Sequence, residues 1–136
     1  MRDNRRLSGT RPKIVLLVDD QALIVSLLAW DIERAIPSSR VVIAGNGAEG
    51  LRVIRQVRPD VIVTDLMMPE MDGYEMVQNI RRESYGRKIP IIGITGSEQE
   101  DGRTIAFRGV CDEFLAKPFL HDELINKVLW LMSAGS

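Results

Sequence analysis

Five polar side chains each follow a short apolar segment of the chain: Asp19, Asp20, Asp65, Thr95 and Lys117. Three carboxylates a few ångströms apart would repel one another, and each close pair costs about 4 kcal/mol at an effective dielectric of about 20. The single ammonium group of Lys117 cannot offset this repulsion, so we expect a divalent cation to bind between the carboxylates. All-oxygen ligands with room for water favour Mg²⁺ over zinc. A cation, a lysine and a threonine together suit a phosphoryl group, with Asp65 placed as its nucleophile.

These side chains converge only if the segments before them are parallel strands of one sheet. Residues 14–18, 41–44, 61–64, 89–94 and 113–116 are short, apolar and mostly rich in β-branched side chains, which predicts strands. Apolar residues recur at helical spacing over 21–36, from the turn 45–50 to 57, and over 74–82, 97–107 and 121–132. Ser97 with Glu100 predicts a capping box for the fourth helix, and residues 84–88 predict a loop. Five alternating strands and helices favour an α/β domain with a parallel sheet covered on both faces.

In such a sheet the carboxyl ends of all strands lie at one edge, where open α/β sheets bind their ligands. The five polar side chains are therefore expected in one cleft. Taken singly, each has an ordinary structural role, such as capping a helix or carrying a solvated charge. Five such groups at four strand ends of one edge are not independent, and together they favour a functional site.

This ordered set resembles the receiver domains of two-component response regulators over residues 13–133. The matching residues are the pair Asp19 and Asp20, Asp65 in DLMMPEMDG, Thr95 in GITG, and Lys117-Pro118-Phe119. The resemblance implies a single doubly wound (βα)5 domain of the flavodoxin-like (CheY-like) type, with five parallel strands in the order 2-1-3-4-5. Residues 1–12 would be a flexible basic arm and residues 134–136 a short tail.

The resemblance also implies a function in signal transduction. Asp65 would accept a phosphoryl group from a histidine kinase or a histidine phosphotransfer protein of a phosphorelay, and the chain would become an aspartyl phosphoprotein. Asp20, Asp65 and the backbone carbonyl of Met67 would bind Mg²⁺, with Asp19 assisting through water. The chain would catalyse only its own phosphorylation and dephosphorylation, and we therefore expect a signalling domain rather than an enzyme.

The same resemblance implies a conformational switch. Thr95 and Lys117 would hold the phosphoryl oxygens, Phe114 would swing inward, and the Lys117–Pro118 bond is cis in the family. A downstream protein, or a second copy in a homodimer, would bind the face formed by residues 97–107, 113–116 and 121–132. Two residues depart from the family pattern: Gly96 replaces the usual alanine, and Phe114 replaces the commoner tyrosine and lacks its hydroxyl. Both departures bear on the lifetime and strength of the switch.

Two other functions stay open. The sequence GNGAEG, from Gly45 to Gly50, fits the G-x-G-x-x-G pattern of a nucleotide-binding module, and Asp65 follows at about the distance of a ribose contact. Against this, the pattern follows the second strand of the chain and leaves Asp19, Asp20 and Lys117 without a role. The other alternative is a receiver-like scaffold that binds partners without phosphorylation, although a degenerate site would be free to lose its acidic set and lysine.

The helix predicted over 21–36 carries two apolar faces. The core-facing stripe is expected to comprise Ile24, Val25, Leu28, Ile32 and Ala35. Leu23, Leu27 and Trp30 fall on another side. These three either pack at the core boundary, with Trp30 near Trp130, or form a docking patch for the phosphoryl donor.

Composition narrows the class of protein. The 136 residues are 45% hydrophobic and 27% charged, as in one soluble domain, and a net charge of −1 gives no case for a direct nucleic-acid or membrane partner. A single cysteine, Cys111, excludes an internal disulfide and is expected as a small buried residue. No apolar run approaches a membrane span, so we expect a cytoplasmic protein. Residues 1–12 carry four arginines and one aspartate. His121 has no second histidine or cysteine nearby, which argues against a zinc site.

Overall fold

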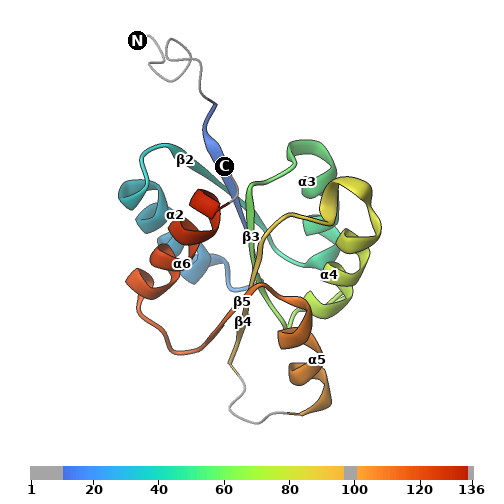
Figure 1. Cartoon of the computed structure of the whole chain (residues 1–136). Helices are drawn as coiled ribbons and strands as arrows, with labels where there is room; N and C mark the ends of the chain where they lie inside the picture. The colour runs from blue at the N-terminus through green and yellow to red at the C-terminus, as the bar shows by residue number, and fades with distance from the viewer. Residues whose placement is uncertain (1–10, 97–100, 135–136) are drawn as a thin grey trace.

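The computed structural model describes residues 11–96 and 101–134. They form one parallel sheet of five strands in the order β2-β1-β3-β4-β5, with helices on both faces (Figure 1). The strands are β1 (Lys13–Val18), β2 (Ser39–Ala44), β3 (Val61–Asp65), β4 (Ile91–Thr95) and β5 (Glu113–Ala116). The helices are α2 (Ala22–Ala35), α3 (Gly47–Val57), α4 (Gly73–Arg82), α5 (Gly102–Val110) and α6 (His121–Ala134), with a 3₁₀ turn η1 (Ser84–Gly86) before β4. The predicted α/β class and strand order are confirmed.

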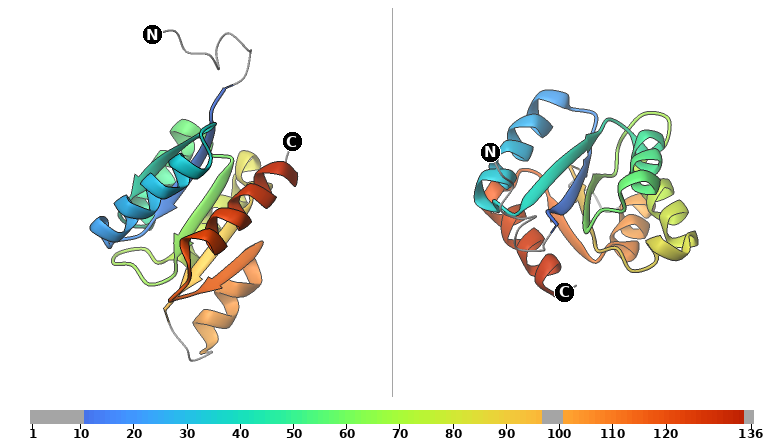
Figure 2. Two further views of the ribbon diagram at one scale, coloured as in Figure 1. Left: turned by 90° about the vertical axis from the view of Figure 1, so that its left-hand side faces the viewer. Right: turned by 90° about the horizontal axis from the view of Figure 1, so that it is seen from above.

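The central strands are buried on both faces, as expected in a parallel sheet covered by helices. Val15 and Leu17 of β1 pack into a core with α2 and α6, whereas Leu16 and Val18 pack into a second core with α3, α4 and α5. Figure 2 shows these two helix layers on opposite sides of the sheet. Because side chains alternate across a strand, one continuous apolar run serves both cores. Among the described residues, none of the helices is long and apolar enough to cross a membrane.

The strand register brings the polar strand ends to one edge. β1 and β3 are direct neighbours in the sheet. Asp65 of β3 pairs with Ile94 of β4, and Thr95 pairs with Ala116 of β5. The residues that follow β1, β3, β4 and β5 therefore meet at the lower edge of the sheet in Figure 1. β2 lies at the outside of the sheet, next to β1 only.

Two strand starts differ from the predictions for local reasons. β4 begins at Ile91 rather than at residue 89, because Pro90 has no N–H group to donate to the sheet. β2 begins at Ser39, two residues early, because its polar residues Ser39 and Arg40 pair with the start of β1. The predicted loop over 84–88 contains the 3₁₀ turn η1.

The start of α5 is also later than predicted. This helix begins at Gly102, and the side chain of Asp101 caps it by accepting a hydrogen bond from the Thr104 N–H at 2.8 Å. It ends at residue 110 rather than 107. The predicted capping box of Ser97 and Glu100 lies outside the described residues. A short polar side chain at the N-cap satisfies a backbone donor that the helix leaves unpaired.

The core-facing stripe of α2 is narrower than predicted. Val25, Leu28 and Ile32 are buried, but Ile24 and Ala35 are exposed. Ile24 lies in the first turn, at the edge where the strands end, and lines an open cleft. Ala35 is the last residue of the helix and borders a groove toward α6. Helical spacing identifies which face of a helix points to the core, but not how far along the helix that face is covered by other elements. The predictions for Ile24 and Ala35, at the two ends of α2, are wrong for this reason.

Candidate functional site

Asp19, Asp20 and Asp65 come together at the carboxyl edge of the sheet. Each offers a carboxylate oxygen, and the three oxygens lie within 4.8 Å of one another. Asp65 is the last residue of β3 and is buried, Asp19 is partly buried and Asp20 is exposed. An all-carboxylate set with one member open to water fits Mg²⁺, which prefers oxygen ligands and keeps several of its waters.

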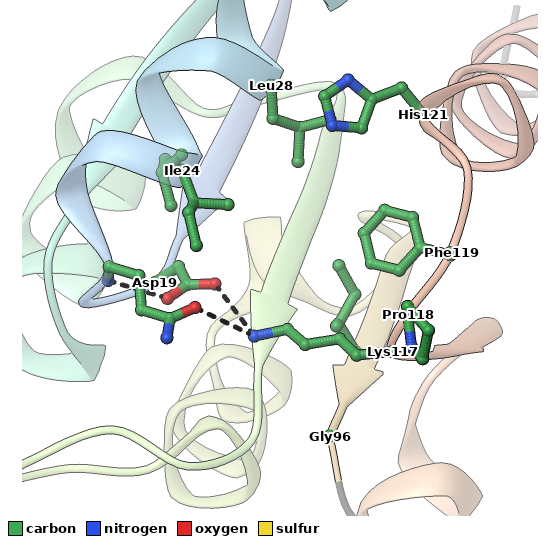
Figure 3. A pocket seen from close by; sticks show the side chains of 11 residues that line it. Asp19, Ile24, Leu28, Gly96, Lys117, Pro118, Phe119 and His121 are labelled. Carbon is green, nitrogen blue, oxygen red and sulfur yellow. Dashed lines mark hydrogen bonds and ion pairs between the residues drawn. The ribbon is translucent and has the colours of Figure 1, made fainter.

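Lys117 reaches this cluster from the loop after β5. Its Nζ donates a hydrogen bond to Asp65 Oδ2 at 3.0 Å and lies 3.7 Å from Asp19 Oδ2. It also contacts Gln21 Oε1 at 3.4 Å. Figure 3 shows the contact of this ammonium group with Asp19. The Gln21 N–H in turn donates to Asp19 Oδ1 at 2.9 Å. Sequence reasoning missed Gln21, for which the only signal was its place directly after the acidic pair.

The pKa values of two groups in this cluster, Asp65 and Lys117, are both raised, for different reasons. Burial raises the pKa of the Asp65 carboxyl above its ordinary value, the hydrogen bond and charge of Lys117 oppose the shift without cancelling it, and the charge of Asp19 adds to it. Burial alone would lower the pKa of Lys117, but its hydrogen bond to Asp65 and the nearby carboxylates outweigh burial and raise that pKa. Lys117 therefore stays protonated at neutral pH, beside an acidic cluster that it does not fully neutralise.

The raised pKa of Asp65 predicts how pH affects stability. The folded state holds the Asp65 proton more tightly than the unfolded chain, so this carboxyl favours folding at low pH, and that contribution is lost as pH rises through the folded-state pKa. Asp65→Asn should therefore raise the melting temperature at pH 7 without Mg²⁺, by about 2–5 °C.

The measurement is thermal unfolding of both proteins between pH 4 and pH 8 in a chelator. The difference should shrink as pH falls, since protonation of the natural carboxyl removes its buried charge. A variant that is less stable than the natural protein at pH 7 would show that the ion pair with Lys117 outweighs the cost of burying the charge.

The loop after Asp65 carries Met67, whose side chain is exposed. Three residues further on the chain makes a tight turn, in which the Met71 N–H donates to the Pro69 carbonyl at 2.8 Å. Glu70, between them, has a positive φ of 69°. This three-residue γ-turn has a backbone geometry that is strained for a residue with a side chain.

Thr95 and Phe114 lie on the neighbouring strands. Thr95 is buried at the end of β4, and its carbonyl accepts a hydrogen bond from the Lys117 N–H at 2.8 Å. Phe114 is partly buried in β5, and its ring meets that of Phe107 edge-on at 5.9 Å between centroids. The guanidinium of Arg108 lies 4.8 Å from the centroid of the Phe114 ring. In this structure the Phe114 ring therefore packs against α5.

A cleft of about 560 Å³ opens beside Lys117, between the start of α2 and the loop from β5 to α6 (Figure 3). Its lining is mostly apolar and includes Ile24, Val25, Leu28, Ile94, Pro118 and Phe119. The Lys117–Pro118 peptide bond in this loop is cis. Nδ1 of His121, at the start of α6, is paired with Asp31 Oδ2 of α2. The sequence placed His121 at a helix start on the surface but gave no signal for this partner, which is 90 residues away.

Leu23, Leu27 and Trp30 are exposed on α2, with 76%, 58% and 59% of their surfaces accessible. The alternative that they pack at the core boundary is therefore wrong. Trp30 packs against Arg34 of its own helix, whose guanidinium lies 4.5 Å from the ring centroid. Trp130 of α6 is itself exposed. The three residues form an exposed apolar surface on α2, the helix whose Ile24, Val25 and Leu28 line the cleft, and we call them the α2 patch.

The glycine-rich turn after β2 does not offer a phosphate cradle. The Gly45 N–H donates to Glu49 Oε1 at 2.6 Å, and the Gly47 N–H donates to the Met71 carbonyl at 3.2 Å. The Asn46 side chain accepts the Glu49 N–H at 2.9 Å and caps α3. The amides that would bind a pyrophosphate are used within the protein, and a carboxylate occupies the turn. These contacts argue against a dinucleotide-binding module.

Cys111 lies between α5 and β5 and is partly buried. Burial, with the nearby charge of Asp112, raises the pKa of its thiol to about 12. Since the thiolate is the reactive form, this thiol is chemically inert at neutral pH.

Known proteins resemble the chain along most of its length. The sequence model of the response regulator receiver domain family matches residues 15–129. The alkaline phosphatase synthesis transcriptional regulatory protein PhoP of Bacillus subtilis is 32% identical over 116 residues, which cover 85% of this chain and 47% of that protein. The chain thus spans about half the length of this relative.

Solved structures agree with this match. The receiver domain of the Francisella response regulator 1452 superposes with a TM-score of 0.80 at 28% identity, covering 91% of this chain and 99% of that one. The receiver domain of the sensor histidine kinase PA1611 from Pseudomonas aeruginosa gives a TM-score of 0.79 at 27% identity, covering 90% and 98% of the two chains. That structure has a magnesium ion coordinated in its active-site cleft.

Proposed function

This chain belongs to the response regulator receiver domain family of two-component signal transduction, and from that membership we propose that it accepts a phosphoryl group on Asp65 and changes conformation in response. One observation carries the proposal: Asp65 ends the central strand inside a cluster of three carboxylates, with the Lys117 ammonium 3.0 Å away. Receiver domains bind Mg²⁺ in their acidic site, and the PA1611 structure has a magnesium ion in its active-site cleft. A nucleophile, a cation site and a fixed positive charge are the parts that phosphoryl transfer needs.

The residues of the cluster fit the cation. Asp20, Asp65 and the Met67 carbonyl would hold Mg²⁺ directly, and Asp19 would assist through a water molecule. When bound, Mg²⁺ neutralises carboxylate repulsion and the charge of phosphoryl oxygens.

The transfer step uses the side chain of Asp65. Its carboxylate oxygen forms the new P–O bond while the P–N bond of the donor phosphohistidine breaks, and the imidazole leaves with the bonding electron pair. Lys117 holds a phosphoryl oxygen with its ammonium group, and Thr95 with its hydroxyl. The product is an acyl phosphate on Asp65.

Phosphorylation would then bias two conformations of the domain. Thr95 and Phe114 would couple Asp65 to the face formed by α5, β5 and α6, where a downstream protein or a second copy would bind. This face exposes Ile105 and Trp130, which supports a role in binding. Gly96, beside the site, leaves out the methyl group that an alanine would place 3.8 Å from Lys117 Cδ, so water would reach the phosphoryl group more easily.

The test is mass spectrometry after incubation with acetyl phosphate and Mg²⁺. The proposal expects the mass of one phosphoryl group to be added in Mg²⁺ and not in EDTA. The scaffold alternative, in which the domain binds partners without phosphorylation, expects an unchanged mass in both.

The α2 patch is the proposed docking surface for the phosphoryl donor, a histidine kinase or histidine phosphotransfer protein. It is apolar and exposed, and it lies on α2, the helix that also lines the cleft next to Lys117. Leu27→Lys should therefore slow transfer from the autophosphorylated cognate kinase at least about tenfold, because burying one ammonium group against an apolar partner is costly. Labelling by acetyl phosphate, which needs no docking, should stay unchanged.

Leu129→Lys is the matched control, since Leu129 is an exposed leucine on α6 outside the patch. It should leave both rates unchanged. Equal loss of both rates in Leu27→Lys, or no change in either, would remove the patch from donor binding.

A further inference from the structure

Arg103, in the first turn of α5, contacts the start of α4 through three residues. Its Nε and Nη2 lie 2.8 and 2.7 Å from Asp72 Oδ2, and Nη2 lies 3.9 Å from Glu75 Oε1. Its guanidinium also lies 4.8 Å from the centroid of the Tyr74 ring. α4 and α5 are neighbours on one face of the sheet (Figures 1 and 2). One side chain thus joins the two helices by ion pairing and by cation–π contact.

Asp72 connects this contact to the loop that begins at Asp65. Its other oxygen, Oδ1, accepts the Glu75 N–H at 2.9 Å and caps α4. The next residue, Gly73, donates its N–H to the Leu66 carbonyl at 2.8 Å, one residue after Asp65. The carboxylate that Arg103 holds is therefore fixed to the backbone beside the phosphoacceptor.

α5 is anchored to the domain by Phe107, whose side chain is fully buried. Among its residues only Thr104 and Phe107 are buried. Gly102 and Gly109 have open space around them, so packing does not require a glycine at either position. Each lacks side-chain contacts and lowers the helix propensity of a nine-residue helix. Besides the burial of Thr104 and Phe107, the ion pair of Arg103 with Asp72 therefore helps to hold α5 in position.

We propose that Arg103 is a latch that holds α5 against α4 in the arrangement described here and so opposes activation of the domain. The inference rests on the proposed function, because activation means occupancy of Asp65 by a phosphoryl group or its mimic. A contact made in one state only stabilises that state, and its removal raises the population of the other. Without the latch, a phosphoryl mimic should bind more tightly, because less of its binding energy is needed to release α5.

The experiment compares Arg103→Gln, Asp72→Asn and the double variant. Asparagine keeps an oxygen that can cap α4 but loses the charge that Arg103 pairs with, so Asp72→Asn removes the latch and leaves the cap. Lys127→Gln is the matched control, since it breaks an ion pair of 2.8 Å with Glu113 that joins α6 to β5. Two quantities are measured: the affinity for beryllofluoride in Mg²⁺, and hydrogen exchange of residues 102–110 without any phosphoryl mimic.

Both single variants should bind beryllofluoride about fivefold more tightly and exchange α5 amides faster, and the double variant should add nothing further. If the substitutions only disrupted the fold, beryllofluoride would bind more weakly instead. Unchanged or weaker binding in Arg103→Gln, or effects equal to those of Lys127→Gln, would overturn the latch. Failure of the natural protein to bind beryllofluoride would instead contradict the proposed function, and unchanged α5 exchange in Arg103→Gln would then reject the latch independently.

Discussion

Asp65→Asn should lose labelling by acetyl phosphate by at least about a hundredfold, because the amide has no carboxylate oxygen to attack phosphorus. Asparagine has nearly the same shape as aspartate, and the folded protein should gain stability from losing a buried charge. Loss of labelling together with a raised melting temperature would separate the chemical role of this residue from any role in folding. A substitution that only damaged the fold would lower both the labelling and the melting temperature.

The measurement is the fraction of protein carrying one added phosphoryl group, read by intact-mass spectrometry at several times. Asp122→Asn is the control, because Asp122 is an exposed aspartate in the first turn of α6. It should be labelled at the rate of the natural protein. Chelation of Mg²⁺ should abolish labelling in both the natural protein and this control, and added Mg²⁺ should restore it. Full labelling of Asp65→Asn would assign the phosphoryl group to another residue.

The sequence predicted which residues meet at the site because their positions follow from topology alone. Asp19, Asp65 and Lys117 each end or follow a strand, and parallel strands in one sheet place such residues at one edge. No side-chain geometry was needed for that inference. The strand order and the two helix layers follow similarly from the alternation of apolar segments. The exposure of Ile24 could not be predicted, because it depends on where the neighbouring loop leaves α2 uncovered.

Contacts between charged residues on the surfaces of two helices carried no sequence signal. The pairs His121 with Asp31 and Arg103 with Asp72 join surface helices across 90 and 31 residues. Charged residues are common on helix surfaces, so the sequence favours no one partner among several. Such contacts depend on how two helices are placed against each other, which only the three-dimensional structure defines.

The second large effect is expected at Gly73, the first residue of α4. A Cβ atom there would lie 2.2 Å from the Asp65 carbonyl oxygen and 3.1 Å from Leu66 Cα, and both are backbone atoms that cannot move aside cheaply. Gly73→Ala should therefore lower the free energy of unfolding by about 3 kcal/mol, since the helix and the end of β3 must move apart. Because that movement displaces Asp65, labelling by acetyl phosphate should also fall.

Gly102→Ala provides an unusually close control. Gly102 also directly follows an aspartate N-cap and begins a helix, but nothing lies within 4 Å of the Cβ that alanine would add. Its substitution should leave the free energy of unfolding within about 1 kcal/mol of the natural value. Urea denaturation of both variants measures the difference. The two Asp-Gly pairs look alike in the sequence, so equal stabilities would mean that α4 does not approach the end of β3 as closely as the structure has it.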